Sequence, residues 1–234
     1  MQRSIWLVIP AYREERLLPR TLRRVPACVD GVVVVDDASP DATSRAAREA
    51  GDARLVLERH PRNLGVGAAI RTGYRRALSE GADLIIVMAA DDQMDPADLP
   101  ALAEPILADR ADYVKGNRLI HPDKRRMPLA RRAAGHALGW LTARATGYAL
   151  SDSQCGYTAI SAAALRVLPL DELWPRYGYP NDLLGLLSQA RLRVAEVPVR
   201  PIYADEASGV RPWHFLTVCW LIARRYAVTK RGRT

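Results

Sequence analysis

The sequence predicts an α/β protein with a mostly parallel sheet flanked by helices, followed by a C-terminal amphipathic helix. Three observations support this prediction. Short apolar runs alternate with helical periodicity, three of these runs end in polar and acidic residues, and residues 212–234 are aromatic and aliphatic, then basic. Strands that alternate with helices of about 10–15 residues indicate βαβ units, which build parallel sheets.

Four strands are expected in the N-terminal half. They are IWLVIP, GVVVVDDAS, ARLVLER and ADLIIVMAA, at residues 5–10, 31–39, 53–59 and 82–90. Helical spacing covers residues 14–25, 42–50 and 66–80 between them. Ser39 or Asp41 is expected to cap the second helix, and Asp95 before Pro96 is expected to cap a later one.

The second half is less regular. Helical periodicity covers residues 128–146, YPNDLLGLLSQA reads as a helix, and VAEVPVRPIY reads as a strand. Because no internal repeat or low-complexity linker interrupts the chain, one domain is expected at residues 1–211, with a basic amphipathic tail at 212–234. That tail suits a helix lying in a membrane interface, or a core-packing helix with a basic end.

Composition narrows the class of partner. The 234 residues include 34 Lys and Arg against 26 Asp and Glu, for a net charge of +8, which favours a polyanionic partner. Three scattered cysteines indicate a reducing compartment. No apolar run reaches the ~18 residues that a membrane span needs. We therefore expect a cytoplasmic protein that can contact the inner face of the membrane peripherally.

Ligands of open parallel sheets bind beyond the carboxyl ends of the strands. PAYREE, VDDASPD and AADDQMDP all follow expected strands, so they should meet at one crevice. Asp91 and Asp92 there are typical of a site for a hard divalent cation, although a capping cluster is the alternative. Asp36 and Asp37 end the second strand, where carboxylates can accept hydrogen bonds from a base or a ribose.

Two further stretches could bind anions. NLGVGAAIRTGY, which contains Arg71, places glycines ahead of a helix, but it lacks the GKS or GKT of a P-loop and alone favours close packing. Residues 118–144 hold seven Lys and Arg and one acid, which favours an anion site over a merely solvated face. No nucleic-acid-binding motif accompanies them, so no nucleic acid is expected.

Taken together, these stretches resemble glycosyltransferase family 2, in the branch of dolichyl- and polyprenyl-phosphate sugar synthases. The matching stretches are VIPAYREE, VVDDASPDAT, NLGVGAAIRTGY, VMAADDQMDP, VKGNRL and DSQCGYTAI, which span roughly residues 4–210 in the family's order. The resemblance implies a Rossmann-like GT-A fold, a nucleotide-sugar donor of the GDP-mannose or UDP-glucose type, Mg²⁺ or Mn²⁺, and inversion at the sugar carbon.

The resemblance also implies site residues, position by position. The nucleoside contacts would be Pro10, Tyr12, Glu14 and Asp37. Asp91 would bind the metal with Gln93 beside it, and Arg118 with Arg131 or Arg132 would meet an acceptor phosphate. Asp152, Gln154 and Gly156 would form the acceptor-side wall. Arg71, Asp92, Tyr203 and Ser208 complete the expected substrate-binding set.

The chain departs from the family pattern at three places. The first Asp of the family's Asp-x-Asp is Ala89 here, so metal binding rests on the second Asp. The usual Lys of the Asn-x-Gly-Lys-Gly stretch is Val66, which removes a phosphate-facing charge. Near Ser208, Tyr203 and Gly209 stand where basic residues are usual. These changes bear on the donor and its diphosphate.

Three functions follow as hypotheses. The first is transfer of a hexose to a polyprenyl or dolichyl phosphate, which is already ionised and needs cations such as Arg118 to position it. The second is transfer to a soluble hydroxyl, which requires a base, and Asp182 is the candidate. The third is a non-catalytic module that binds a nucleotide sugar or nucleic acid.

Overall fold

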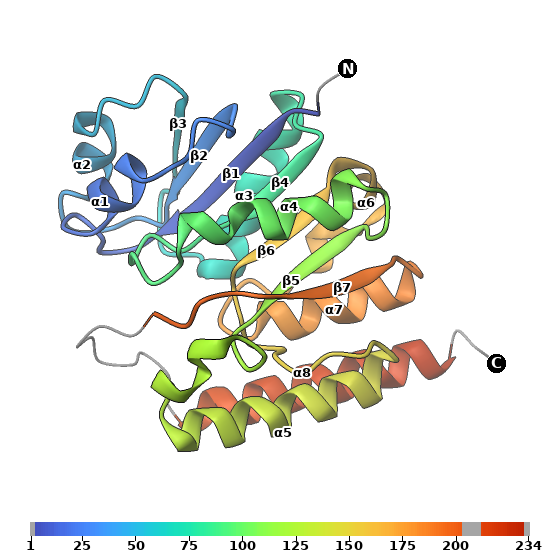
Figure 1. The fold of residues 1–234 in the computed structure, drawn as a ribbon. Coiled ribbons are helices and arrows are strands. Elements are labelled where there is room, and N and C mark those ends of the chain that lie inside the picture. The colour runs from blue at the N-terminus through green and yellow to red at the C-terminus, as the bar shows by residue number, and fades with distance from the viewer. Residues whose placement is uncertain (1–2, 203–211, 232–234) are drawn as a thin grey trace.

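A seven-stranded sheet forms the centre of the computed structural model, which describes residues 3–202 and 212–231 (Figure 1). Its strand order is β3-β2-β1-β4-β6-β5-β7. The strands are β1 (Ile5–Ala11), β2 (Gly31–Asp36), β3 (Leu55–Arg59), β4 (Leu84–Val87), β5 (Tyr113–Asn117), β6 (Thr158–Ser161) and β7 (Val194–Pro198). Only β6 runs against the others, between β4 and β5. The predicted mostly parallel α/β sheet is confirmed.

Helices cover both faces of the sheet. They are α1 (Leu18–Arg23), α2 (Thr43–Glu49), α3 (Val66–Ser79), α4 (Leu99–Leu107), α5 (Leu129–Thr146), α6 (Ala162–Val167), α7 (Tyr179–Gln189) and α8 (Pro212–Arg231). The apolar core on one face includes residues of α1, α2 and α4, and the core on the other includes residues of α3, α6 and α7. Central strands such as β2 are buried along their whole length, which explains their continuous apolar sequence.

Local structure differs from the sequence-based expectation at two helix starts. The helix expected over 14–25 is confined to α1, because the chain first makes a turn in which Arg13 has a φ of 63°. The N-cap of α2 is Ala42, and Asp41 instead accepts a hydrogen bond from the Thr43 amide, 3.2 Å away. Asp95 caps the 3₁₀ turn η1 (Pro96–Asp98) as predicted, accepting from the Ala97 amide.

The C-terminal helix α8 lies beside α5, and both pack against α7 (Figure 1). Val218, Leu221 and Ile222 are buried, so this face of α8 packs against the protein. Among the described residues, the helices all fall short of the length and apolar character that crossing a bilayer requires. The expected domain boundary adjoins residues 203–211, which lie outside the described residues, so the division into domain and tail stays a prediction.

Truncation of Leu221 tests whether α8 is part of the folded body. Leu221 is 0% exposed and Leu216, on the opposite side of the same helix, is 70% exposed. We expect Leu221→Ala to lower the free energy of unfolding by about 2–5 kcal/mol, because it leaves a cavity. Leu216→Ala should stay within about 0.5 kcal/mol of wild type. Urea denaturation of the two variants measures this, and equal effects would show that α8 is not packed on the body.

Candidate active site

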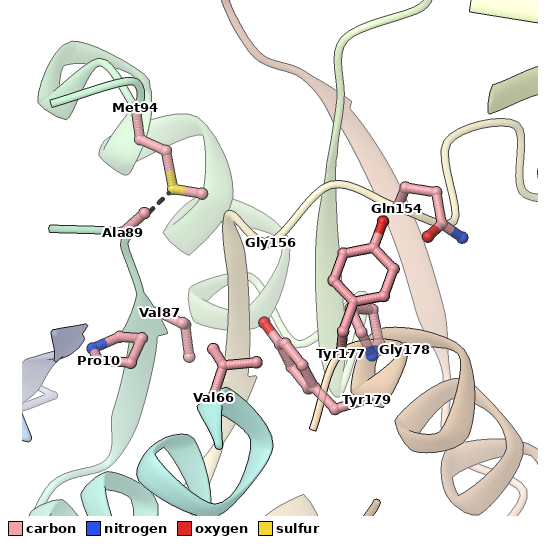
Figure 2. A pocket seen from close by; sticks show the side chains of 11 residues that line it. Pro10, Val66, Val87, Ala89, Met94, Gln154, Gly156, Tyr177, Gly178 and Tyr179 are labelled. Carbon is pink, nitrogen blue, oxygen red and sulfur yellow. Dashed lines mark hydrogen bonds between the residues drawn. The ribbon is translucent and has the colours of Figure 1, made fainter. Parts of the chain in front are cut away.

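An apolar pocket of about 200 Å³ opens at the carboxyl ends of β1 and β4 (Figure 2). The N-termini of α3 and α7 and the loop before β6 close its other sides. The pocket is lined by Pro10, Val66, Val87, Ala89, Met94, Gln154, Gly156, Tyr177, Gly178, Tyr179 and Pro180. Of the predicted site residues, it brings together Pro10 and Gln154, with Gly156.

The loops after β1 and β2 are tied together by backbone-to-side-chain hydrogen bonds. The Arg13 amide donates to Ser39 Oγ at 3.0 Å, and the Glu14 amide donates to Thr43 Oγ1 at 2.9 Å. A second, open cleft of about 600 Å³ lies along the first loop, and Glu14 is among its lining residues. Tyr12 is exposed beside it. Two of the three predicted strand-end loops therefore meet, as expected.

Asp36 and Asp37, predicted as nucleoside contacts, are almost inaccessible to solvent and are paired within the protein. Asp36 accepts hydrogen bonds from the Ser39 amide and from Arg59. Asp37 accepts from the amides of Leu64 and Gly65 at 2.8 and 2.7 Å, and it contacts His60. Both carboxylates therefore hold the loops around the crevice.

Asp91 is the half-buried carboxylate at the end of β4, and it accepts a hydrogen bond from the Gln93 amide at 3.1 Å. The backbone of Asp92 has a φ of 57°, and its carboxylate forms an ion pair with Arg24 at 2.5 Å. Asp95 pairs with the same arginine. Asp92 and Asp95 therefore have a structural partner in Arg24, and Asp91 is the carboxylate that the sequence predicts as a metal ligand.

Within the described ranges, no group of three or more His, Cys, Asp and Glu side chains is arranged to hold a metal ion. A single carboxylate still suits Mg²⁺ or Mn²⁺ that arrives with a nucleotide, because such ions typically take one or two protein carboxylates and complete their coordination with phosphates and water. The carboxylate of Asp91 fits that donor set, and the side-chain oxygen of Gln93, two residues on, is of the same oxygen-donor type.

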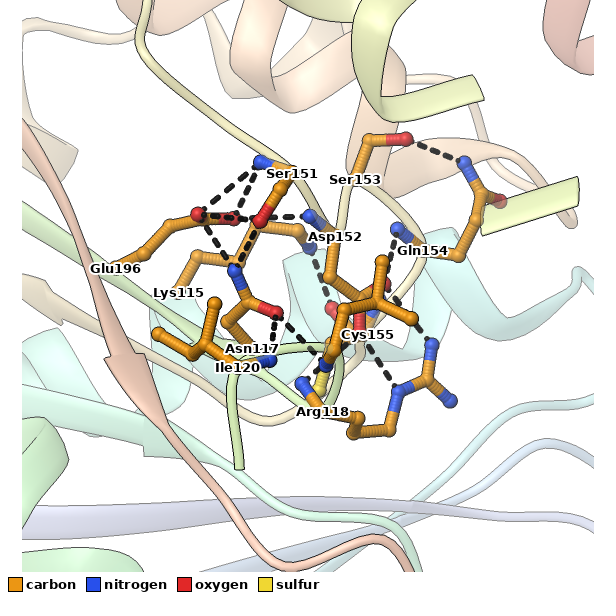
Figure 3. Close-up of polar contacts among 11 residues, drawn as sticks. Lys115, Asn117, Arg118, Ile120, Ser151, Asp152, Ser153, Gln154, Cys155 and Glu196 are labelled. Atoms are coloured by element: carbon orange, nitrogen blue, oxygen red, sulfur yellow. Dashed lines mark hydrogen bonds and ion pairs between the residues drawn. The ribbon is translucent and has the colours of Figure 1, made fainter. Parts of the chain in front are cut away.

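Arg118 at the end of β5 is clamped by Asp152 (Figure 3). Its Nε and Nη2 atoms donate to the two carboxylate oxygens at 2.8 and 3.0 Å, in the bidentate geometry that fixes a guanidinium. Burial raises the pKa of Asp152, but the charge and hydrogen bonds of Arg118 outweigh it, so this pKa lies below the usual value. Arg118 is thereby held in one orientation at the end of β5.

Two residues that the sequence prediction missed hold the same loop. Lys115 is completely buried in β5 and donates from Nζ to the Cys155 carbonyl at 2.5 Å. Glu196 of β7 accepts from the Ser151 and Asp152 amides at 3.0–3.1 Å (Figure 3). A charged residue inside an otherwise apolar strand, as in YVKGN and VAEVP, was the signal that could have indicated them.

Asp182, the predicted base for a hydroxyl acceptor, lies at the start of α7 and is enclosed by its partners. It is completely buried, and both its carboxylate oxygens accept from Arg225 of α8, at 2.6 and 3.0 Å. The Trp174 amide donates to it as well. The ion pair joins α7 to α8 and leaves the carboxylate enclosed.

The remaining predicted residues fall in several places. Gln154 is held by Asn181, whose side-chain oxygen lies 2.8 Å from the Gln154 amide nitrogen. Burial raises the pKa of the Tyr177 phenol, and the charges of Arg118 and Arg131 oppose this rise. Arg71 instead donates to the Asp171 carbonyl. Arg132 is partly exposed on α5, and Tyr203 and Ser208 lie outside the described residues.

Comparison with solved structures defines the class of protein. Glucosyl-3-phosphoglycerate synthase from Mycobacterium tuberculosis, solved with Mn²⁺, UDP and glucosyl-3-phosphoglycerate, superposes with a TM-score of 0.74 over 96% of this chain and 80% of that chain, at 22% identity. The predicted GT-A fold is therefore confirmed. The model described as glycosyl transferase family 2 matches residues 6–173, so the chain belongs to this family and is a glycosyltransferase.

Curated relatives are similar over most of their length. UDP-N-acetylglucosamine–dolichyl-phosphate N-acetylglucosaminyltransferase of Methanococcus voltae is 31% identical over 217 residues, covering 86% of both chains. Undecaprenyl-phosphate mannosyltransferase of Micrococcus luteus is 35% identical over 199 residues, covering 82% of this chain and 81% of the relative. The predicted resemblance to polyprenyl-phosphate sugar transferases is thus confirmed.

Substitution of Asp152 tests the clamp on Arg118 through its pH dependence. Since the folded-state pKa of Asp152 is lowered, its ionised form stabilises the fold above the unfolded value of about 3.9, and this stabilisation is lost as the pH falls through the folded pKa. We expect Asp152→Asn to lower the free energy of unfolding at neutral pH by about 3 kcal/mol. Stability of the variant should fall less steeply below about pH 4.

Urea midpoints measured from neutral pH to about pH 3 give this dependence. Asp109→Asn is the matched control, because its side chain is 80% exposed. A variant whose curve runs parallel to that of wild type would contradict the role of Asp152.

Proposed function

We propose that this glycosyltransferase transfers a hexose, with inversion, from a nucleoside-diphosphate sugar to a polyprenyl phosphate. The names of two relatives support a lipid-phosphate acceptor. The single observation that carries the proposal is the contrast between Arg118 and Asp182. Arg118 is fixed by Asp152 at the end of β5, and its charge and that of Arg131 both act on Tyr177, which lines the pocket. The candidate base for a hydroxyl acceptor, Asp182, is instead buried and paired with Arg225 of α8.

A phosphate acceptor needs no base. Its second pKa is about 6, so the attacking oxygen is largely ionised at neutral pH. In the proposed reaction that oxygen forms a bond to the anomeric carbon while the bond from this carbon to the diphosphate oxygen breaks on the opposite side. Arg118 and Arg131 would hold the acceptor phosphate in line, which replaces proton transfer by positioning.

The proposed metal site consists of Asp91 and Gln93. When bound there, Mg²⁺ or Mn²⁺ supplies positive charge to the leaving diphosphate. Asp91 would hold the donor and metal together at the end of β4, and Pro10, Tyr12 and Glu14 would contact the nucleoside on the β1 side.

Calorimetric titration with UDP and with GDP, each with and without Mn²⁺, tests the donor site. We expect one nucleotide to bind, more tightly with Mn²⁺, and Asp91→Ala to weaken binding by at least about 10–100-fold, the loss that is typical even for residues that only support a metal ligand. Asp92→Asn is the matched control because its carboxylate is paired with Arg24 and Asn tolerates the positive φ of this position, so it should change binding little. Absence of binding for both nucleotides would contradict the proposed function.

Contact with a membrane follows from the outer surface of the α5–α8 pair. Leu129 and Trp140 of α5 and Leu216 and Trp220 of α8 are exposed, and the Trp220 ring also packs edge-on against Trp174, with ring centroids 5.7 Å apart. Arg224 stacks over the Trp220 ring at 5.6 Å. Apolar and aromatic side chains beside cations suit the interface of an anionic bilayer, where each cation adds about 1 kcal/mol. We propose that this surface binds the membrane that holds the acceptor.

Replacing both tryptophans tests the membrane contact. Trp140→Ser with Trp220→Ser should weaken binding to vesicles containing about one third anionic lipid at least 10-fold, because two large apolar side chains leave the interface. Leu107→Ser with Val167→Ser, two exposed apolar residues elsewhere, is the matched control. Sedimentation with vesicles measures this, and equal binding of both double variants would refute the assignment of the surface.

A further inference from the structure

The two charge-removing departures from the family pattern meet in one place. Val66 begins α3 and Ala89 follows β4, and the two residues line the same apolar pocket (Figure 2). The family pattern would place a Lys and an Asp at these positions. Loss of opposite charges on two walls of one pocket changes its chemistry while keeping its net charge. The group that binds there should therefore be partly apolar.

The other walls fit this interpretation. Val87 and Pro10 add aliphatic surface, and the Met94 thioether lies against Ala89, with Sδ 3.2 Å from the Ala89 amide nitrogen. A sugar hydroxyl facing such walls would lose its hydrogen bonds to water without replacement, at a cost of about 1–3 kcal/mol. Burying a methyl group there is favourable instead.

The polar groups at the pocket are the carboxamide of Gln154 and the hydroxyls of Tyr177 and Tyr179 (Figure 2). The amide nitrogen of Gln154 is committed, since it donates to Ser153 Oγ and Asn181 Oδ1 at 2.8 Å each. These bonds fix the carboxamide, and among the described residues no donor is bonded to its carbonyl oxygen. A ligand N–H would match that oxygen. An acetamido group carries one N–H and one methyl group, and the pocket offers an acceptor and an apolar wall.

We propose that the apolar pocket selects a donor sugar that carries an N-acyl group, such as an N-acetylhexosamine. This inference rests on the proposed function, in which Asp91 binds the metal and the donor. Ala89, which lines the pocket, is two positions before Asp91 in the loop after β4. Its volume of about 200 Å³ suits a small part of a ligand rather than a drug-sized molecule, for which about 300–1,000 Å³ is usual. Val66, Ala89 and Gln154 are then specificity residues.

Calorimetry with UDP, UDP-glucose and UDP-N-acetylglucosamine, each with Mn²⁺, tests the proposal. One apolar group in a fitted pocket changes affinity by about 10–200-fold, so UDP-N-acetylglucosamine should bind at least 10-fold more tightly than UDP-glucose. Equal binding of the two sugars would overturn the inference and leave the proposed function intact. Binding of GDP-mannose instead of either UDP-sugar would likewise overturn the inference and leave the proposed function intact. Failure of UDP and GDP alike to bind would instead refute the proposed function.

Two variants locate the preference in the pocket. Ala89→Asp restores a carboxylate and should reduce the preference for the acetamido sugar to below about 3-fold. Val66→Thr keeps the shape, adds a hydroxyl, and should reduce it in the same direction. Val167→Asp, at an exposed valine outside the pocket, is the control and should keep the wild-type ratio. Thermal unfolding verifies that each variant folds, and an unchanged ratio in both pocket variants would overturn the proposal.

Discussion

The site depends on the direction of one strand. Because β6 runs antiparallel between β4 and β5, its first residue lies beside the last residue of β4, with Thr158 opposite Val87. The same residue pairs with Lys115 of β5. The loop that precedes β6 therefore emerges at the edge where β1, β4 and β5 end. A parallel strand in this position would send that loop to the opposite edge and remove Gln154 from the pocket.

The loop before β6 is then held by charge rather than by apolar packing. Asp152 binds Arg118, Lys115 donates to the loop backbone, and Glu196 accepts from two of its amides. Buried charges are costly when one partner is missing, so the members of this network stabilise one arrangement and penalise others. These buried charges lie around the loop before β6, on the side of the proposed acceptor. In-line attack requires the acceptor oxygen to be placed accurately, so a rigid loop is useful there.

Local sequence patterns predict the fold well and the partners of charged residues poorly. The runs ending at Ala11, Asp36 and Val87 are continuous and apolar, so their strands and the meeting of their ends could be predicted. The local sequence around Asp36 and Asp182 does not distinguish these paired acids from acids that bind a ligand. Their partners, Arg59 and Arg225, lie 23 and 43 positions away, and this pairing is decided by packing that a local pattern does not encode.

The pocket could be predicted only in part for the same reason. Ala89 and Val66 were recognisable as departures, but their convergence on one cavity depends on the crossing of α3 over β1 and β4. Residues that close the cavity from the second half, such as Tyr177 and Gly178, carry no motif. The α8 helix was ambiguous because one helix can present a packed face and an exposed apolar face at once.

The strand order also bears on how the chain is made. β4 gains its neighbour β1 as soon as it is synthesised, but its other edge waits for β6, which begins only at Thr158. At ~5–20 residues per second, the ribosome needs roughly 4–14 s to cover that interval. During this time the nascent chain holds an unpaired, wholly apolar edge, Leu84–Val87, of the kind that recruits other strands. Chaperone binding during translation would be concentrated in this window.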